Sequence, residues 1–256
     1  KRQLYDERKQ VKKAMLQTKQ KFEKTGDDKL KRDINRFDNT QQAVKILLNS
    51  LYGALGNQYF RYYDLKVAEG ITLSGQLAVR WAEENMNKFM NKILGTEKDY
   101  VIAMDTDSVY VNMGPLVKKL EPKNPVKFID DACVQQFQPM LEKAYDAMFT
   151  KMNAFDNRMV MEREAIADKA VWTAKKRYIM NVHNNEGVQY SEPKLKIQGI
   201  EAVKSSTPMV VRNKFKQAYK IILTSTEEEL QKFVKDFYNE FTSVSYTHLR
   251  AHETVS

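Results

Sequence analysis

Two aspartates two positions apart, Asp105 and Asp107, are the residues in this sequence whose type and spacing most directly indicate chemistry. They lie in the tetrapeptide Asp-Thr-Asp-Ser, a short polar run typical of a tight turn. Two carboxylates held so close repel each other unless a cation lies between them. Oxygen ligands suit a hard ion, and Mg²⁺ often binds one or two carboxylates together with substrate phosphates. The pair therefore indicates two-metal phosphoryl transfer, and a hydrophilic hairpin tip with incidental acids is the alternative.

The segments that flank this turn are predicted to position it. Residues 100–104 and 109–111 are rich in β-branched and aromatic side chains, which favour strands, so we expect a hairpin. Residues 71–94 have the apolar spacing of a long helix. We expect this helix to pack under the hairpin through a stripe formed by Leu73, Leu77, Trp81, Met86 and Phe89.

A second group of polar side chains is predicted on a helix over residues 38–57. Capping residues predict its start, and a Gly-Asn pair predicts its end. Lys45, Asn49 and Tyr52 recur at helical spacing, so a cation, an amide and a phenol share a face that can meet phosphate, sugar and base. An ordinary amphipathic helix is the alternative, because another face is apolar, with Leu47, Leu48, Leu51 and Leu55.

The charge of the chain favours a polyanionic partner. Its 256 residues carry a formal net charge of +9 with a pI of about 9.3, which fits nucleic acid better than an acidic protein. A well-solvated basic surface is the alternative. Residues 1–36 hold thirteen Lys and Arg against six Asp and Glu, and they predict a basic helix that breaks at residues 25–28.

The cysteine content and the hydropathy pattern exclude several classes of protein. Cys133 is the only cysteine, which excludes an internal disulfide and a cysteine-based zinc site. Neither a signal peptide nor an apolar run of membrane-spanning length is present. We therefore expect a soluble, cytoplasmic protein of a reducing compartment.

The remaining segments alternate between predicted loops, helices and strands. Residues 113–126 hold three of the six prolines with lysines between them and predict a surface loop. Residues 128–153 and 209–241 have helical periodicity. Residues 158–182 alternate and carry aromatic side chains, which predicts two strands.

The basic run Lys175-Lys176-Arg177-Tyr178 lies within the second of these predicted strands. It offers cations for phosphates together with an aromatic ring, a combination that suits a DNA backbone. An edge strand protected by lysines is the competing explanation.

Three of these motifs together resemble those of family B DNA polymerases. Residues 45–53 have the pattern K-x-x-x-N-S-x-Y-G, which resembles the fingers-helix motif of that family. Residues 105–108 resemble its D-T-D-S palm motif, and residues 175–178 resemble its K-K-R-Y primer-gripping motif. All three stand in the order of the family, which makes the resemblance far more specific than any single motif.

The resemblance covers about residues 1–243 and is closest to the replicative polymerases of tailed bacteriophages. It implies an α+β fold in which an antiparallel palm sheet with packed helices joins a helical fingers hairpin and part of a helical thumb. On this basis residues 1–57 are fingers helices, residues 58–207 the C-terminal part of the palm, and residues 208–243 the start of the thumb.

The activity implied by the resemblance is attack of a primer 3′-hydroxyl on the α-phosphate of a deoxynucleoside triphosphate. The implied cofactor is Mg²⁺, as two ions in the complete enzyme. The implied partners are primer-template DNA, deoxynucleoside triphosphates and a sliding clamp, the last through parts of a polymerase outside this chain.

The resemblance also implies a role for individual residues. Asp107 ligates the catalytic metals, Asp105 shapes the same site less directly, and Glu164 is a neighbour of that site. The others bind substrates: Arg8 and Lys45 hold the triphosphate, Asn49 and Tyr52 flank the incoming nucleotide, and Lys175, Lys176, Arg177, Tyr178 and Lys204 hold the primer-template.

One departure from the family pattern bears on activity. The other palm motif of the family, with the second metal-bridging aspartate, is expected N-terminal to Lys1, so we expect this chain to be inactive alone. A non-catalytic, basic nucleic-acid-binding module is the alternative function. It is disfavoured because pure DNA binding does not require paired carboxylates, which repel phosphate unless a metal is bound.

Residues 244–256 do not continue the helical pattern, and we expect them to be a non-native tail. The amino-acid sequence of this segment resembles the translation product of a sequencing-adapter oligonucleotide. Without this tail His183 is the only histidine, which leaves no basis for a histidine triad or a histidine-based zinc site.

Overall fold

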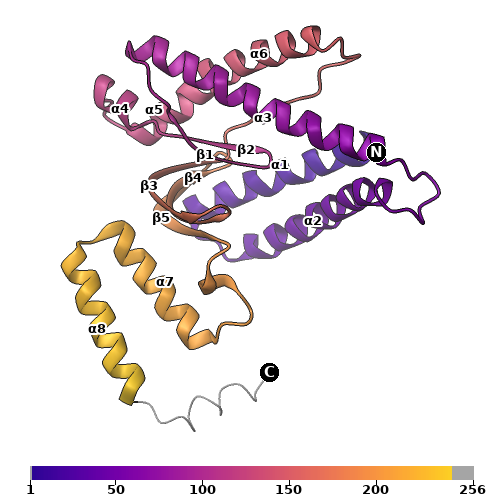
Figure 1. Cartoon of the computed structure of the whole chain (residues 1–256). Coiled ribbons are helices and arrows are strands. Elements are labelled where there is room, and N and C mark those ends of the chain that lie inside the picture. The colour runs from indigo at the N-terminus through magenta and orange to yellow at the C-terminus, as the bar shows by residue number, and fades with distance from the viewer. Residues whose placement is uncertain (1, 244–256) are drawn as a thin grey trace. The chain divides into compact units, whose positions relative to one another are not determined.

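The computed structural model describes residues 2–243, so the predicted non-native tail at 244–256 lies outside the described residues. The described chain divides into two compact units. The first contains residues 2–166 and 184–191, and the second contains residues 167–183 and 192–243. Helices alternate with two small antiparallel sheets, which confirms the predicted α+β class (Figure 1). No helix within residues 2–243 has both the length and the apolar character that crossing a bilayer requires.

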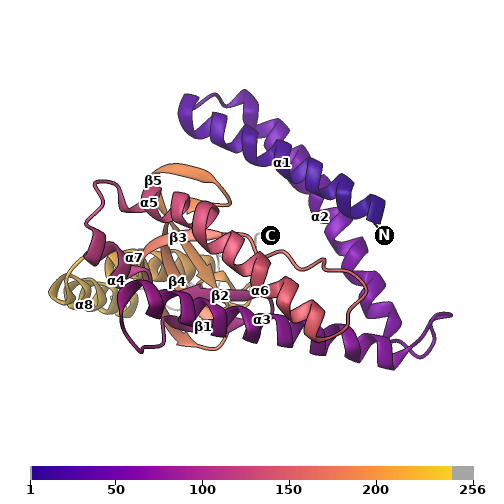
Figure 2. The ribbon, with the colours of Figure 1, turned by 90° about the horizontal axis from the view of Figure 1, so that it is seen from above.

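The first unit begins with a helical hairpin formed by α1 (Arg2–Thr25) and α2 (Lys29–Leu55), which lie side by side in both views (Figures 1 and 2). The predicted break is confirmed at Gly26, whose φ of +67° is readily adopted only by glycine. The predicted helix start at residue 38 is wrong, because α2 is continuous from Lys29. The residues predicted to cap a helix start lie inside α2 instead, and the Thr40 hydroxyl donates to the Arg36 carbonyl, one turn back in the same helix.

The long helix α3 (Leu65–Leu94) packs under the hairpin as predicted, although it starts before residue 71. Asp64 caps its first turn by accepting a hydrogen bond from the Val67 N–H. Leu73, however, is 62% exposed, so its predicted place in the core is wrong. The shared core begins further along the helix and includes Ala78, Ala82, Met86 and Met90 of α3 with Phe137, Leu141, Tyr145 and Met148.

Residues 113–126, predicted as a surface loop, contain helix α4 (Gly114–Leu120) and the start of helix α5 (Pro125–Ala132), and within this range only residues 121–124 form a loop between the two helices. The helix α4 carries a proline in its first turn, where backbone N–H groups have no acceptor within the helix, so the missing N–H costs no hydrogen bond. Its Leu116 is buried in the core. The helix α5 begins with a second such proline.

The predicted helix over residues 128–153 is confirmed as a run of three helical segments. In this run α5 leads into a π-helical segment, η1 (Cys133–Phe137), and then into α6 (Gln138–Lys151). Pro139 has no N–H to give to the preceding turn and its ring crowds that turn, which accounts for the widened helix at this point.

A three-stranded sheet follows, in the order β3 (Ala165–Ala174), β4 (Arg177–Asn185) and β5 (Val188–Gln198). The two predicted strands correspond to β3 and β4, but residues 158–164, predicted as strand, have no regular structure. The third strand, β5, was not predicted, because its charged residues and proline are unfavourable for a strand.

The second unit contains most of that sheet, a 3₁₀ turn η2 (Glu201–Val203) and two helices, α7 (Met209–Thr224) and α8 (Glu227–Ser243). The predicted helix over residues 209–241 is confirmed, with a break at Ser225 and Thr226. Ile179 of β4, Ile200 and Leu223 of α7 form a small buried core.

Candidate active site

The Asp-Thr-Asp-Ser segment forms the tip of a β-hairpin, as predicted. The strands β1 (Val101–Asp105) and β2 (Ser108–Val111) are antiparallel, and Asp105 is paired with Ser108. Thr106 and Asp107 are therefore the whole connection between the two strands. Thr106 has a φ of 45°, a left-handed conformation that is uncommon for a threonine and costs free energy.

Hydrogen bonds within the turn converge on Asp105. Its carbonyl oxygen accepts from the Asp107 N–H at 2.5 Å and from the Ser108 hydroxyl at 3.0 Å. Its carboxylate accepts from the Thr106 hydroxyl at 3.0 Å. Asp105 is half-buried, whereas the Asp107 side chain is exposed at the tip. The two acids therefore have different surroundings, and Asp107 presents the more accessible carboxylate.

The base of the hairpin is attached to α3. Asn87 of α3 accepts a hydrogen bond from the Tyr100 N–H at 2.8 Å, and the Tyr100 carbonyl accepts from the Asn112 N–H at 2.8 Å. Val101 is buried in the core, and Val109 and Val111 pack against that core. The tip is thus carried by a rigid base rather than by a mobile loop.

The donor atoms at the tip fit a hard divalent cation. Both are carboxylates, and Mg²⁺ is usually held by one or two such groups completed by water and substrate phosphates. Within residues 2–243, no three acidic, histidine or cysteine side chains lie close enough together to hold a metal ion.

The predicted polar face of α2, with Lys45, Asn49 and Tyr52, is extended by Gln41 of the same helix and by Arg8 of α1. Gln41, Lys45, Asn49 and Tyr52 follow one another at steps of about one helical turn. Arg8 of α1 donates from Nη2 to the Gln41 side-chain oxygen at 3.4 Å. The two cations predicted to hold a triphosphate, 37 positions apart in the sequence, are thereby brought to neighbouring turns of one surface.

Gln41 was missed by the sequence reasoning, and it orients Arg8. It is 5% exposed, and its amide nitrogen donates to the Asp38 carboxylate at 2.9 Å, which points its oxygen toward Arg8. Its position one turn before Lys45, on the same face, is the signal that could have identified it.

Tyr52 lies at the other end of this face, where α2 meets α3. Its hydroxyl bonds to the Thr72 hydroxyl of α3 at 2.7 Å, and its ring is 40% exposed. Lys45 and Asn49 are exposed. The apolar face predicted for this helix is only partly covered, since Leu47 and Leu51 are 54% and 40% exposed.

The basic run at residues 175–178, in the second unit, lies at a turn. Lys175 and Lys176 form the connection between β3 and β4, and Lys176 has a φ of 64°. The explanation as an edge strand protected by lysines is wrong, because β4 is the central strand of its sheet. Tyr178 is buried near Trp172, with ring centroids 5.9 Å apart, and so supports the turn from below.

Glu201 joins two of the predicted DNA-binding cations. Its carboxylate lies 3.5 Å from Arg177 Nη1 and 3.1 Å from Lys204 Nζ. A hydrogen bond from its own backbone N–H, and then the bond from Lys204, lower the pKa of the Glu201 carboxyl group. Sequence reasoning missed Glu201, although an acid three positions before Lys204 is a recognisable signal.

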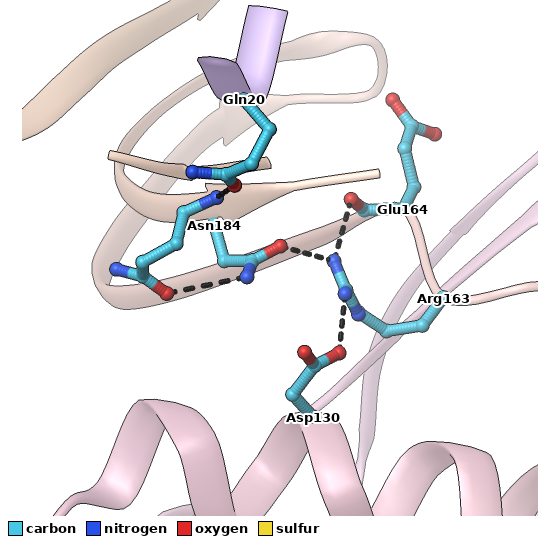
Figure 3. A network of polar contacts seen from close by, with 6 residues as sticks. Gln20, Asp130, Arg163, Glu164 and Asn184 are labelled. Carbon is cyan, nitrogen blue, oxygen red and sulfur yellow. Dashed lines mark hydrogen bonds and ion pairs between the residues drawn. The ribbon is translucent and has the colours of Figure 1, made fainter. Parts of the chain in front are cut away.

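Glu164 lies just before β3 and is fixed by its main chain (Figure 3). Its carbonyl oxygen accepts from Arg163 Nη1 at 3.2 Å and from the Glu186 N–H at 2.5 Å. Its carboxyl group points away from the Arg163 guanidinium. Arg163 was not among the predicted site residues.

Comparison with known proteins gives one family for nearly the whole chain. The family model described as DNA polymerase family B matches residues 2–254. The chain is 40% identical over 224 residues to the DNA-directed DNA polymerase of Enterobacteria phage T4, covering 81% of this chain and 25% of that protein. It is 38% identical over 217 residues to the DNA-directed DNA polymerase of Escherichia phage RB69, covering 79% of this chain and 24% of that protein. The chain is 23% identical over 236 residues to DNA polymerase 1 of Aeropyrum pernix, and the alignment covers 88% of this chain and 20% of that protein. The chain thus spans about a quarter of the length of the phage relatives.

Proposed function

Since this chain belongs to DNA polymerase family B, we propose that it supplies the nucleotide-holding and primer-holding surfaces of a template-directed DNA polymerase. The reaction is addition of a deoxynucleotide to a primer 3′-hydroxyl by two-metal phosphoryl transfer. One observation carries this proposal. The Arg8–Gln41 contact joins α1 to α2 so that Arg8, Lys45, Asn49 and Tyr52 follow one another along one surface.

Along this surface the order of side chains matches the order of groups in a nucleotide. Arg8 and Lys45, at one end, hold the triphosphate, since phosphate oxygens are best met by cations. Asn49 and Tyr52, further along α2, flank the sugar and the nascent base pair. The Thr72 bond to the Tyr52 hydroxyl supports this role, because it fixes the ring at the junction of two helices.

The hairpin tip supplies the metal-binding carboxylates in this proposal. Asp107, exposed at the tip, is the direct ligand, and Asp105, engaged by the turn, shapes the site. Two bound Mg²⁺ ions would lower the pKa of the attacking hydroxyl and neutralise charge that develops on the phosphate. A further bridging aspartate, from the other palm motif of the family, completes the site from outside this chain, so the chain alone does not extend a primer.

The second unit holds the primer-template in this proposal. Lys175 and Lys176 project from the β3–β4 turn, while Arg177 and Lys204 are held next to each other by Glu201. Such cations bind the DNA backbone without reading its sequence. Tyr178, buried behind them, contributes by supporting the turn.

A chimaeric polymerase tests the proposal. Residues 2–243 replace the matching segment of the phage T4 relative, and gel-based primer extension is measured with Mg²⁺. We expect extension by the chimaera and none by the 256-residue chain alone. A chimaera that folds and binds primer-template but never extends it would support the alternative, a non-catalytic nucleic-acid-binding module. Binding of a sliding clamp is a further proposal, tested by adding the clamp of phage T4 to the same assay.

A further inference from the structure

The helix α1 makes two side-chain contacts with the turn that joins β4 to β5. Lys12 Nζ lies 2.5 Å from the Glu186 carboxylate, and the Gln20 side-chain oxygen accepts from the Gln189 N–H at 2.8 Å. Lys12 and Glu186 are only 33% and 26% exposed. These contacts join the N-terminal helix to residues far along the chain, all within the first unit.

The turn that receives α1 is itself rigid. It consists of two residues, Glu186 and Gly187, with φ values of 50° and 85°. Positive φ at both positions is the arrangement that best matches the twist of a two-residue hairpin. The Glu186 N–H is also bonded to the Glu164 carbonyl. The turn can therefore act as a fixed support for the helix.

Arg163 lies at the centre of the contacts behind this turn (Figure 3). Its guanidinium donates to the Asn184 side-chain oxygen at 2.7 Å, to the Glu164 carbonyl, and to Asp130 of α5. The Asn184 amide in turn donates to the Gln189 side chain at 3.2 Å. Arg163 is 13% exposed and Asn184 is 3% exposed, so water competes little for these bonds.

This set of contacts ends beside the proposed triphosphate site. Lys12 follows Arg8 by one helical turn on α1, so the two side chains lie on the same face of the helix. A shift of α1 on the β4–β5 turn would therefore move the turn of the helix that carries Arg8.

We propose that Arg163 is a positioning residue: through the Glu186–Gly187 turn it docks α1 and sets the position of Arg8 for an incoming triphosphate. The docking stands on geometry alone, whereas its effect on the triphosphate rests on the proposed function. The Lys12–Glu186 pair and the Gln20–Gln189 bond are the two points of attachment.

Hydrogen exchange of the Glu186 and Gln189 amides in the 256-residue chain tests the docking. Lys12→Ala should speed exchange of both amides about fivefold, because a partly exposed ion pair is lost. The swap of Lys12→Glu with Glu186→Lys should restore slow exchange. Lys13→Ala, at an exposed neighbour on the same helix, is the matched control. Unchanged exchange in Lys12→Ala, or equal acceleration in Lys13→Ala, would overturn the docking. Arg163→Lys keeps the charge but loses the planar set of donors, so it should speed exchange of both amides. Exchange rates in Arg163→Lys equal to those of the unaltered chain would overturn the role of Arg163.

Binding of dATP with Mg²⁺, followed by NMR shifts of α1 amides, tests the positioning of Arg8. Gln20→Ala removes one attachment without changing the charge near Arg8, so a raised dissociation constant reports position alone. We expect an increase of about threefold, and none for Gln17→Ala, at an exposed position of the same helix. Docking lost in Gln20→Ala with unchanged dATP affinity would overturn the positioning role. If the unaltered chain binds no dATP while its amides are protected, the proposed function of Arg8 fails and the network is structural only.

Discussion

The two aspartates at the hairpin tip differ in what they can still bind. The carbonyl and the carboxylate of Asp105 both accept hydrogen bonds from neighbouring residues of the turn. Asp107 is exposed, and its backbone N–H is what closes the turn. Under the proposed function, loss of the Asp107 carboxylate therefore removes a metal ligand, whereas loss of the Asp105 carboxylate removes one internal hydrogen bond of the turn.

In the chimaeric polymerase, Asp107→Ala should abolish primer extension, because the remaining tip carboxylate, Asp105, is half-buried and accepts a hydrogen bond from Thr106. Asp105→Ala should slow extension less severely, since it loosens the turn. Single-turnover extension assays measure both rates, and circular dichroism checks that each variant folds. Activity that survives Asp107→Ala would contradict its assignment as the direct metal ligand.

A second prediction separates the residues of the α2 face by role. Lys45→Ala should lower kcat/KM for correct nucleotides by about tenfold to a hundredfold, the usual value of a hydrogen bond to a charged group. Tyr52→Ala should instead mainly change discrimination against mispairs. Single-nucleotide insertion kinetics measure both effects. Lys29→Ala, an exposed lysine at the other end of α2, is the control and should have wild-type kinetics.

The lowered pKa of Glu201, which pairs with Arg177 and Lys204, makes its contribution to stability depend on pH. A carboxyl group with a lowered pKa stabilises the fold above its unfolded pKa, and this contribution is lost as the pH falls through the folded value. An NMR titration of the Glu201 side chain should therefore give a midpoint below 4.5, the ordinary value. Lys204→Ala should move that midpoint upward. A midpoint at or above 4.5 in the unaltered chain would show that the pairing seen here does not persist in solution.

Among the elements, the β3–β4 turn depends on a glycine outside it. Gly199 has a φ of +65°, and a Cβ atom there would lie 2.2 Å from the Lys176 carbonyl oxygen. The close approach of Gly199 to this carbonyl thus leaves no room for a side chain. The turn that carries Lys175 and Lys176 therefore packs against the backbone at Gly199 as well as on the buried Tyr178.

Gly199→Ala should therefore destabilise the 256-residue chain by more than about 2 kcal/mol, because the positive φ and the steric clash both oppose it. Gly187→Ala is the matched control, since Gly187 has a φ of +85° but a Cβ atom there would meet no other atom within 4 Å. The control should lose only the cost of the backbone conformation, about 1 kcal/mol. Urea unfolding followed by circular dichroism measures both, and equal losses would show that the close approach is not limiting.

For the whole molecule, the excess of positive charge determines how the chain would bind DNA under the proposed function. The formal net charge is +9, and four of the cations concerned, at residues 175–177 and 204, belong to one unit. Binding through phosphates releases counterions, so affinity depends steeply on salt.

Fluorescence anisotropy with a primer-template should show affinity falling about a hundredfold between 50 mM and 200 mM salt if four phosphates are neutralised. Replacing Lys175 and Lys176 together by alanine should lower the slope of log affinity against log salt by about two. An affinity that is independent of salt, or a slope that the double substitution leaves unchanged, would contradict binding through this turn.

The sequence by itself determined the local features of this protein. The β-branched and aromatic residues around the polar tetrapeptide 105–108 were sufficient to predict the hairpin, because a two-residue turn between such strands needs only local interactions. Gly26 ended α1 where predicted, since its conformation is available to few other residues. Three short motifs in order were sufficient to predict the family.

Tertiary structure alone decided which distant residues meet. The Arg8–Gln41 contact depends on how α1 packs on α2, and the Arg163 network depends on four separate segments. No periodicity in the sequence records such pairings. The errors have the same origin. Leu73 has the spacing of a core residue but lies before the part of α3 that shares the core. The proline-containing segment 113–126 includes helix α4, whose Leu116 is buried in that core. Periodicity shows which side of an element is apolar, but only packing decides which part of that side is covered.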